Sequence, residues 1–526
     1  MSASGFLQAE GTRLVDGTGR EVLLRGVGLG NWMLPEGYMW RFPQHGPQSP
    51  TEIEALVLDL LGPDGAAAFW RSFRQRFVTE PDIARIAAEG FDHVRLPMSH
   101  RLLADALGRP VEEGYALIDR LVGWCRRHGL RVVLDLHAAP GGQTGTNIDD
   151  SGGRPSLFET GEPYWTRTVE LWTEIARRYR DEPVIAAYDL LNEPLPPGRG
   201  HHAPALAALY RELTVAIRAV DAVHLLTYEG THWSTDWSIF TAPPDPNAML
   251  QFHKYWSAPD LASIRPYLEV RDRLGVPIYM GEGGENTPPW LQCAFGLYER
   301  ERISWNFWPW KKVGTWSSPL SIRPPDGWDE VVAYAAGSGP RPTPGRAEEA
   351  FAELLAGMEP ERCDRRGDVL AALFHRAPLR LAPEAFAASG SSGPGAGRRP
   401  NAFRAEAVAA VTLAGGGRAA DYDYADQPWD GSSQFRVGLE PGDWVSYEVA
   451  PGTPAPHRVV LELAAPVREL PVVCANGAGL RLAATGSQIV AALPEPPDGV
   501  WELRIAAGAE RIVLAGIIVA AGDPDR

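Results

Sequence analysis

The chain has 526 residues, 44% of them hydrophobic, and a formal net charge of -16 at pH 7. This length suggests two to four domains, and the apolar fraction is that of a folded globular protein. The acidic balance argues against nucleic acid as a partner, because nucleic-acid-binding proteins need a basic face. The four cysteines, Cys125, Cys293, Cys363 and Cys474, are spaced too widely to indicate a zinc site or a disulfide framework.

The first residues, MSASGFLQAEGTRLVDG, have neither the basic start nor the apolar core of a secretory signal. No apolar run approaches the roughly 18 residues that a membrane helix needs. The sequence therefore predicts a cytoplasmic protein with no membrane span, or a secreted one if a leader has been removed. It does not indicate an oligomeric state.

Eight short, almost continuously apolar runs recur along the chain, as expected for strands that are buried on both faces. They cover 21–30, 93–98, 131–137, 184–191, 224–230, 249–255, 276–282 and 303–310. Helix-like segments separate them, for example 79–90, 117–129, 165–182 and 205–220. This alternation predicts an α/β fold, and eight units favour a closed (β/α)8 TIM barrel. A doubly wound open sheet is the alternative, but GVGLGN at 26–31 does not have the spacing of its nucleotide-binding fingerprint.

The chain changes in character after the eighth run. The Pro- and Gly-rich stretch 314–330 is long enough to suggest a lid, and a helix over about 345–358 is expected to close the barrel. AASGSSGPGAGRRP at 387–400 has the composition of a linker. Short strands with little helical periodicity follow. We therefore predict a catalytic barrel at 1–385, a linker at 386–400 and a C-terminal β-sandwich at 401–526.

Polar residues end several predicted strands, which is where barrel enzymes place their chemistry. These residues are Arg95, His137, Asn192, Glu193, His253, Tyr255, Glu282 and Trp308. Taken singly, a rim ion pair, a core histidine or a packed tryptophan would explain most of them. Glu193 and Glu282 are harder to explain in that way, because an unpaired carboxylate in an apolar setting costs several kcal/mol. Asp135 and Asp189 lie within strands, and we interpret both as structural.

Two carboxylates that face each other across a barrel mouth are typical of glycoside hydrolysis. Retaining enzymes hold them about 5–5.5 Å apart, one as nucleophile and the other as acid and then base. The two roles require different pKa values. A cation such as Arg95 beside Glu282 would keep the nucleophile ionised, and Tyr255 would donate to the same carboxylate. The other polar residues would orient the acid or bind sugar hydroxyls: His137, His253 and, at the 2-hydroxyl, Asn192.

Four short motifs resemble the signature of glycoside hydrolase family 5, the cellulase family of clan A. They are RLP at 95–97, LNEP at 191–194, HKY at 253–255 and GEGG at 281–284. The resemblance covers about residues 10 to 380. It implies a retaining β-glycosidase that needs no cofactor or metal, with Glu193 as acid/base and Glu282 as nucleophile. Six residues would surround the sugar in the −1 subsite: Arg95, His137, Asn192, His253, Tyr255 and Trp308.

Two stretches are similar to the exo-β-1,3-glucanase branch of that family: LRGVGLGNWMLPEGY at 24–38 and DLHAAPGGQTGTNIDDSGG at 135–153. In that branch a glutamate matching Glu36 binds the terminal glucose. The resemblance therefore implies exo action on β-glucosides or short β-1,3-glucans. Asn31 stands where a glycine is usual and 143–153 differs, so a β-mannosidase or a glycolipid β-glucosidase of the same family is the alternative. The structural interpretation of Glu36 is a solvated loop residue.

The C-terminal region resembles a carbohydrate-binding module of family 6, through GLEPGDWVSYEVA at 438–450 and FRAEAV at 403–408. Tyr422, Tyr424 and Trp429 would then form a stacking platform, and Trp444 would pack inside the sandwich. A domain that only supports the barrel is the alternative. For the whole chain, the non-enzyme alternative is a carbohydrate-binding protein on an inactive barrel. The expected partner is in each case a β-linked oligosaccharide or glycoside.

Overall fold

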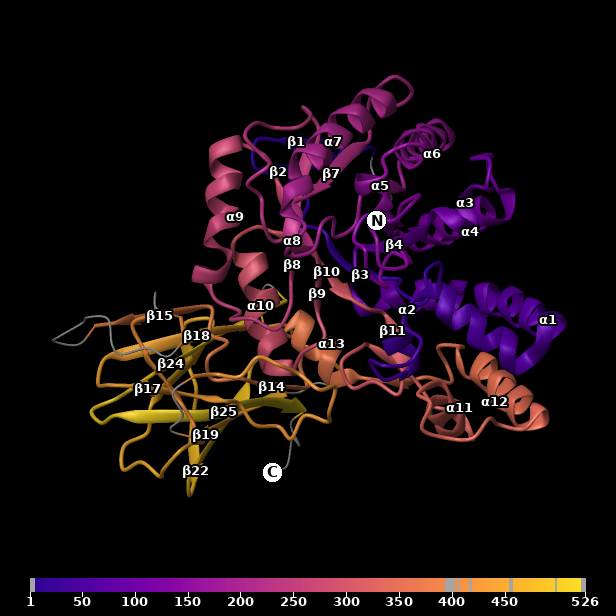
Figure 1. Cartoon of the computed structure of the whole chain (residues 1–526). Helices are drawn as coiled ribbons and strands as arrows, with labels where there is room; N and C mark the ends of the chain where they lie inside the picture. Colours follow the sequence, from indigo (N-terminus) through magenta and orange to yellow (C-terminus); the bar gives the residue numbers. More distant parts are fainter. Residues whose placement is uncertain are drawn as a thin grey trace. The chain divides into compact units, whose positions relative to one another are not determined.

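The computed structural model describes residues 5–392, 403–404, 407–415, 419–453, 457–496 and 499–521 (Figure 1). The chain divides into two compact units, which we describe separately. The first comprises Met1–Lys254, Tyr267–Gly284 and Arg302–Arg365, and the second Tyr255–Pro266, Glu285–Glu301 and Arg366–Arg526. None of the helices in the described residues is both long enough and apolar enough to cross a membrane.

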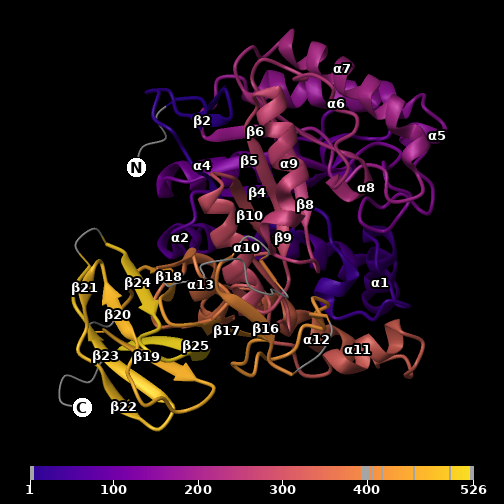
Figure 2. The ribbon, with the colours of Figure 1, turned by 90° about the vertical axis from the view of Figure 1, so that its left-hand side faces the viewer.

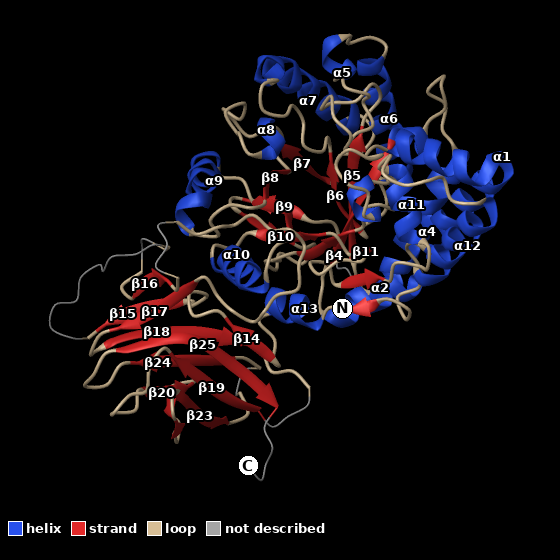
Figure 3. Ribbon diagram, turned by 60° about the horizontal axis from the view of Figure 1, so that its bottom comes forward, coloured by secondary structure: helices blue, strands red, loops and turns tan. Residues whose placement is uncertain are grey.

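The first unit contains a closed barrel of eight parallel strands, with helices around it (Figure 3). The strands are β3 (Arg25–Gly28), β4 (His93–Ser99), β5 (Arg131–Ala138), β6 (Ile185–Asp189), β7 (Leu225–Glu229), β8 (Ala248–Lys254), β9 (Ile278–Gly284) and β10 (Ser304–Trp308), with β10 pairing back to β3. Each lies within or overlaps one of the eight apolar runs, so the predicted (β/α)8 TIM barrel is confirmed. The residues of β4 to β10 are all buried, which explains why these runs do not alternate with polar residues.

Helices alternate with the barrel strands. They are α1 (Pro50–Arg76), α2 (Glu80–Glu89), α3 (His100–Leu103), α4 (Glu112–His128), α5 (Ser156–Glu159), α6 (Tyr164–Tyr179), α7 (Ala203–Arg218), α8 (Thr231–Ser234), α9 (Leu261–Leu274), α11 (Trp328–Ala335) and α12 (Pro344–Gly357). Thr79 and Asp82 form a capping box at the start of α2, and left-handed glycines end α2 and α4. The helical segments predicted near α2, α4, α6, α7 and α12 are confirmed.

The stretch 314–330, which we expected to be a lid, is built into the first unit. β11 (Lys311–Val313), β12 (Leu320–Ile322) and β13 (Asp364–Arg365) form a small three-stranded sheet. Between β11 and β12, the side chains of Thr315, Ser317 and Ser318 are buried. A separate hairpin, β1 (Gln8–Glu10) and β2 (Arg13–Val15), precedes the barrel.

The second unit contains two antiparallel sheets, whose strands are labelled between Figure 1 and Figure 2. One sheet consists of β14 (Leu379–Leu381), β16 (Ala410–Leu413), β17 (Phe435–Leu439), β19 (His457–Leu463), β22 (Ala483–Thr485), β23 (Gln488–Leu493) and β25 (Ile512–Ala521). The other consists of β15 (Ala388–Ser391), β18 (Asp443–Val449), β20 (Val472–Ala475), β21 (Ala478–Gly479) and β24 (Trp501–Ala506). Alternate residues of β19 and β24 are buried, and one apolar core contains residues of both sheets. The resemblance to a family 6 carbohydrate-binding module stays a prediction.

The sheets of the second unit begin earlier in the chain than the predicted boundary at 401. β14 precedes the predicted 386–400 linker and β15 lies inside it, whereas 393–400 lies outside the described residues. Gly390 looks like linker composition, but in β15 it packs against Trp444, whose ring would lie 2.6 Å from an added Cβ. The glycine is therefore required by sheet packing.

Two helices also belong to the second unit, α10 (Pro288–Arg300) and α13 (Gly367–Phe374). The Gln292 side chain of α10 donates to the main-chain oxygen of Arg380 at 2.7 Å and accepts from the N–H of Ala382 at 2.8 Å. A helix that precedes the sandwich by about 90 residues is thus hydrogen-bonded to its strand β14.

Candidate active site

Glu193 and Glu282 lie at the same edge of the barrel, at the carboxyl ends of two strands. Glu282 is a residue of β9, and Glu193 follows the end of β6. Three atoms lie within 4.8 Å of one another: one carboxylate oxygen of Glu193, one of Glu282 and a ring nitrogen of His253. The structure therefore brings the two predicted catalytic carboxylates together.

The guanidinium of Arg95 is fully buried and contacts four carboxylates. Its Nη1 donates to Oε2 of Glu282 at 2.7 Å, and its Nε donates to Oδ2 of Asp189 at 2.9 Å. Nη2 lies 3.2 Å from both Oδ2 of Asp135 and Oε1 of Glu229. Burial lowers the pKa of Arg95, but these four carboxylates raise it well above its ordinary value. Asp135 and Asp189 are thus partners of the cation, a contact that our interpretation of both as structural did not specify.

Burial has the largest effect on the proposed nucleophile and raises the pKa of Glu282 above its ordinary value of 4.5. The charges of His253 and Arg95 oppose this effect, whereas the carboxylate of Glu193 adds to it. The predicted contact between Arg95 and Glu282 is present. The charge of Arg95 therefore acts in the predicted direction, and it limits the rise in this pKa without reversing it.

Glu193 is held from two sides. Its backbone N–H donates to Oε2 of Glu229 at 2.7 Å, and its φ of 40° lies in the left-handed region. Its Oε1 lies 2.8 Å from Nδ1 of His253. Burial lowers the pKa of His253, but the carboxylates of Glu229 and Glu282 raise it well above its ordinary value. The protonated ring then donates from Nδ1 to Glu193.

Glu229 and Gln251 complete this network, and the sequence analysis missed both. The side chains are fully buried, at the end of β7 and within β8. Nε2 of Gln251 donates to Oε1 of Glu229 at 2.5 Å and to Oδ2 of Asp189 at 3.0 Å. Glu229 ends its apolar run, LLTYEG at 225–230, just as Glu282 ends its own. The strand-end rule would have found Glu229 if it had been applied to the fifth run.

His137, Asn192 and Trp308 lie at the ends of β5, β6 and β10 and contact one another in sequence. Nδ1 of His137 lies 2.7 Å from Oδ2 of Asp135. Although burial lowers the pKa of His137, Asp135 raises it to about 9, and in either charge state Nδ1 carries a proton toward Asp135. Asn192 accepts from Arg95 at 2.8 Å, and its Nδ2 lies 3.2 Å from Nε2 of His137. The Trp308 ring stacks on that of His137, with centroids 5.8 Å apart.

Two of the three glycines of GVGLGN, Gly28 and Gly30, pack against Trp308, and the third, Gly26, packs against the ring of His93. A Cβ on Gly28 or Gly30 would lie 2.4 or 2.5 Å from the Trp308 ring, so both positions exclude a side chain. Nε1 of Trp308 donates to the hydroxyl of Tyr38 at 2.8 Å. These glycines therefore pack against an aromatic ring, which agrees with our rejection of the nucleotide-binding interpretation.

Glu36 is buried, with 5% of its surface exposed, so it is not a solvated loop residue. Its backbone N–H donates to Oδ1 of Asn31 at 3.1 Å, and the same oxygen accepts from Nε1 of Trp40 at 2.7 Å. Asn31 has a φ of 70°, a conformation that asparagine tolerates better than most residues other than glycine. Asn31 thus serves a position where glycine was expected. The contact of Glu36 with a terminal sugar stays a prediction.

The loop after β5 is fastened to the strand ends by Gln143. Its Nε2 donates to the main-chain oxygens of His137 at 2.8 Å and Asn192 at 3.0 Å. Oδ2 of Asp149 accepts the backbone N–H groups of Gln143 and Thr144, both at 2.6 Å. This part of the rim is therefore fixed by buried hydrogen bonds.

Tyr255 is the first residue after β8 and belongs to the second unit. Its predicted bond to Glu282, which belongs to the first unit, stays a prediction.

Among the described residues, Glu193, His253 and Glu282 are also a group whose atoms lie close enough together to hold a metal ion. Positive charge already faces both carboxylates, however, because Arg95 contacts Glu282 and His253 contacts Glu193. The arrangement suits attack by one carboxylate and proton transfer by the other.

The chain matches a family model described as Cellulase (glycosyl hydrolase family 5) over residues 61–314. It is 30% identical over 347 residues to "Beta-xylosidase" of Phanerodontia chrysosporium, and the aligned region covers 59% of this chain and 71% of that protein. It is 32% identical over 238 residues to "Probable glucan 1,3-beta-glucosidase A" of Emericella nidulans, and the aligned region covers 44% of this chain and 57% of that protein.

One solved structure, titled "Crystal structure of endogalactoceramidase", covers 97% of this chain and 100% of its own. The TM-score is 0.50 at 17% sequence identity, so the likeness concerns the fold. The family match includes β4 to β10 and with them the buried pair of glutamates. The chain therefore belongs to glycosyl hydrolase family 5, and the protein is a glycoside hydrolase.

Proposed function

We propose that the protein is a retaining β-glycosidase that releases single sugars from β-glucosides or short β-1,3-glucans. The observation that carries the proposal is the short separation of Glu193 and Glu282. One carboxylate oxygen of Glu193 lies within 4.8 Å of one carboxylate oxygen of Glu282. Retaining enzymes hold their two carboxyl groups about 5–5.5 Å apart, whereas inverting enzymes leave about 6.5–9.5 Å for a water molecule. The short separation favours direct attack by a carboxylate on the anomeric carbon.

In the first step Glu282 attacks the anomeric carbon while Glu193 protonates the glycosidic oxygen. The bond between these two atoms breaks, the alcohol leaves, and a glycosyl ester forms on Glu282. In the second step Glu193 removes a proton from water, the water oxygen attacks the anomeric carbon, and Glu282 departs as a carboxylate. Arg95, 2.7 Å from Oε2 of Glu282, stabilises that departing charge, and His253 holds Glu193 in place.

The glucan 1,3-β-glucosidase relatives support a β-glucoside, with Glu36 proposed to contact the terminal sugar. The β-xylosidase relative matches a larger share of this chain, which makes a β-xyloside the second candidate. A screen of nitrophenyl β-glucoside, β-xyloside, β-mannoside and β-fucoside identifies the sugar. Turnover of the β-mannoside alone would replace the glucoside proposal with the β-mannosidase alternative.

The roles of the two glutamates are tested on the nitrophenyl glycoside that this screen selects. Glu282→Ala should abolish turnover, and azide should restore it with a glycosyl azide of inverted configuration as the product. Glu193→Ala should spare a substrate with a good leaving group far more than a natural glycoside, because only the natural one needs the acid. Failure of azide to rescue Glu282→Ala contradicts the assignment of the nucleophile.

Exo action is tested by the products formed early from laminari-oligosaccharides. We expect the monosaccharide and the oligosaccharide shortened by one unit. A ladder of internal fragments would instead show endo cleavage.

A further inference from the structure

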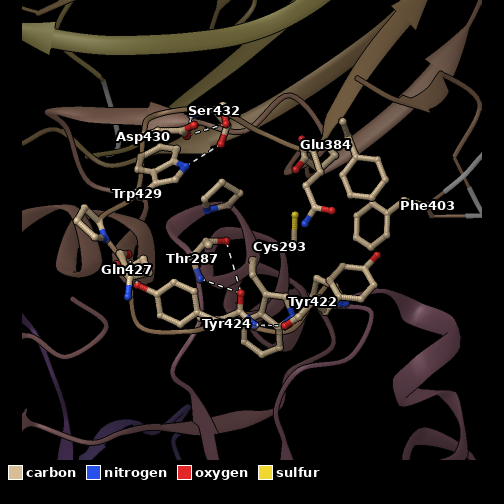
Figure 4. Close-up of a pocket in the computed structure, with 17 residues that line it drawn as sticks. Thr287, Cys293, Glu384, Phe403, Tyr422, Tyr424, Gln427, Trp429, Asp430 and Ser432 are labelled. Atoms are coloured by element: carbon tan, nitrogen blue, oxygen red, sulfur yellow. Dashed lines mark hydrogen bonds between the residues drawn. The ribbon is translucent and has the colours of Figure 1, made fainter. Parts of the chain in front are cut away.

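A pocket of about 310 Å³ lies within the second unit (Figure 4). Its lining residues all belong to that unit, whereas Glu193 and Glu282 belong to the first. Aromatic side chains supply much of its wall: Trp290 of α10, Phe403, Tyr422, Tyr424, Trp429 and Phe435. The three residues predicted as a stacking platform are among them, so the structure brings these three to one cavity.

The side chains of Tyr424 and Trp429 are held by main-chain oxygens of their own loop. The hydroxyl of Tyr424 donates to the main-chain oxygen of Gln427 at 2.7 Å, and Nε1 of Trp429 donates to that of Ser432 at 2.7 Å. The main-chain oxygen of Tyr422 accepts from Nδ2 of Asn286 at 2.9 Å. Because these polar groups are already engaged, Tyr424 and Trp429 offer a ligand mainly their ring faces.

Glu384 provides a polar group that lacks a partner. The residue is 3% exposed, and its Oε1 accepts from Oγ of Ser433 at 2.5 Å. Its Oε2 is buried and has no hydrogen-bond partner among the described residues. In Figure 4, Glu384 and Phe403 lie on the opposite side of the pocket from Trp429 and Gln427. An unmet buried acceptor is costly, and a ligand hydroxyl in the pocket would satisfy it.

We propose that this pocket is a second, non-catalytic carbohydrate site that binds one pyranose ring, stacked on Trp429 with a hydroxyl donating to Oε2 of Glu384. Aromatic walls with a few placed polar groups are typical of small-ligand sites, and the volume is near the lower end of their range. The proposal rests on the proposed function only for the choice of sugars to test.

An organic cation is the other ligand class that aromatic walls can bind. The surroundings of Glu384 oppose it. Burial raises the pKa of Glu384 to about 7, so its negative charge is incomplete at neutral pH. The positive charges of Arg404 and Arg436 lie near enough to lower that pKa in part, and they would repel a further cation. A neutral, hydroxyl-rich ring does not need a full negative charge on Glu384, and it is not repelled by the two arginines.

The test uses the full chain with Glu282→Gln, which cannot turn over a glycoside, titrated calorimetrically with laminaribiose and the methyl β-glycosides of glucose, xylose and mannose. We expect two classes of site for at least one sugar. Trp429→Ala or Glu384→Gln should weaken one class by about tenfold and leave the other intact. Trp429→Phe should keep most of the affinity, because a ring remains. Glu502→Gln, an exposed glutamate in β24, is the matched control and should change neither class.

The proposal is overturned if no sugar binds to a site that responds to Trp429→Ala or Glu384→Gln while both variants melt as the parent does. It is also overturned if tetramethylammonium binds there and the sugars do not. In the chain with both catalytic glutamates, Trp429→Ala and Glu384→Gln should leave turnover of the aryl glycoside unchanged. Absence of turnover in the unmodified protein would count against the proposed function and not against this pocket.

Discussion

The backbone N–H of Glu193 donates a hydrogen bond of 2.7 Å to Oε2 of Glu229, across the ends of the paired strands β6 and β7. The other oxygen of that carboxylate faces Arg95 and Gln251. Glu229 therefore stabilises a backbone conformation that residues other than glycine seldom adopt. We infer that Glu229 positions the proposed acid/base without contacting the substrate.

Glu229→Gln tests this positioning role. The amide oxygen can still accept from Glu193, but the amide NH2 would then face Arg95 and Gln251, both of which are donors. We expect kcat on a natural glycoside, whose leaving group needs the acid, to fall roughly a hundredfold with a much smaller change in KM, because a slightly displaced acid still permits binding. Glu21→Gln, which removes a carboxylate paired with Arg302 ahead of β3, is the matched control. A loss of stability without a loss of kcat would assign Glu229 a structural role only.

The acid side of the pH profile reports on Glu282. This carboxyl must be ionised to attack, and its pKa is raised, so kcat/KM should decline as the pH falls through a value above 4.5. The charge of Glu193 contributes to this rise. Glu193→Gln should therefore move the acid limb to lower pH, measured on a substrate whose leaving group needs no protonation. A limb that stays in place or rises would contradict electrostatic coupling of the pair.

Removal of divalent metal should leave the activity unchanged. Arg95 and His253 already supply positive charge to Glu282 and Glu193, so no step requires a bound ion. The measurement is kcat/KM before and after dialysis against EDTA, with calcium or zinc added back. A loss that one of these ions restores would instead make Glu193, His253 and Glu282 a metal site.

Asn31 can be tested by separating its backbone conformation from its side chain. Asn31→Gly keeps the left-handed conformation but loses the bonds to Glu36 and Trp40, and we expect a loss of about 1–3 kcal/mol in the free energy of unfolding. Asn31→Ala loses the same bonds and adds backbone strain, so it should cost roughly 1 kcal/mol more. Denaturant unfolding measures both values. Equal losses would show that the φ of 70° carries no cost here.

The barrel could be predicted because its strands are buried on both faces, so each leaves a continuous apolar run in the sequence. Helix α1 could not be predicted in the same way. Gly62 has a φ of 68° and Pro63 follows it. This Gly-Pro pair is typical of a turn, although helix lies on both sides of it. The early strands of the sheets in the second unit were also hidden, because Gly390 of β15 suits a linker as well as it suits the space beside Trp444.

Within the site, Glu193 and Glu282 were recognisable because a carboxylate at the end of an apolar strand needs a reason to be there. Glu229 carried the same signal. Gln251 carried none, since a neutral amide within a strand is compatible with many roles. Its importance follows from contacts with Asp189 and Glu229, which lie on other strands and come close to Gln251 when β6, β7 and β8 pair.

The Gln292 side chain of α10 donates to Arg380 and accepts from Ala382, and these two hydrogen bonds bear on how this enzyme can be divided or recombined. A graft that carried only 401–526 to another protein would leave behind α10, β14 and β15. Strand β25 would lose β14 as a neighbour and β18 would lose β15, and both would present open edges prone to aggregation. Residues 401–526 therefore do not form a domain that can be moved by itself. A fusion protein that folds has to include α10, β14 and β15 as well.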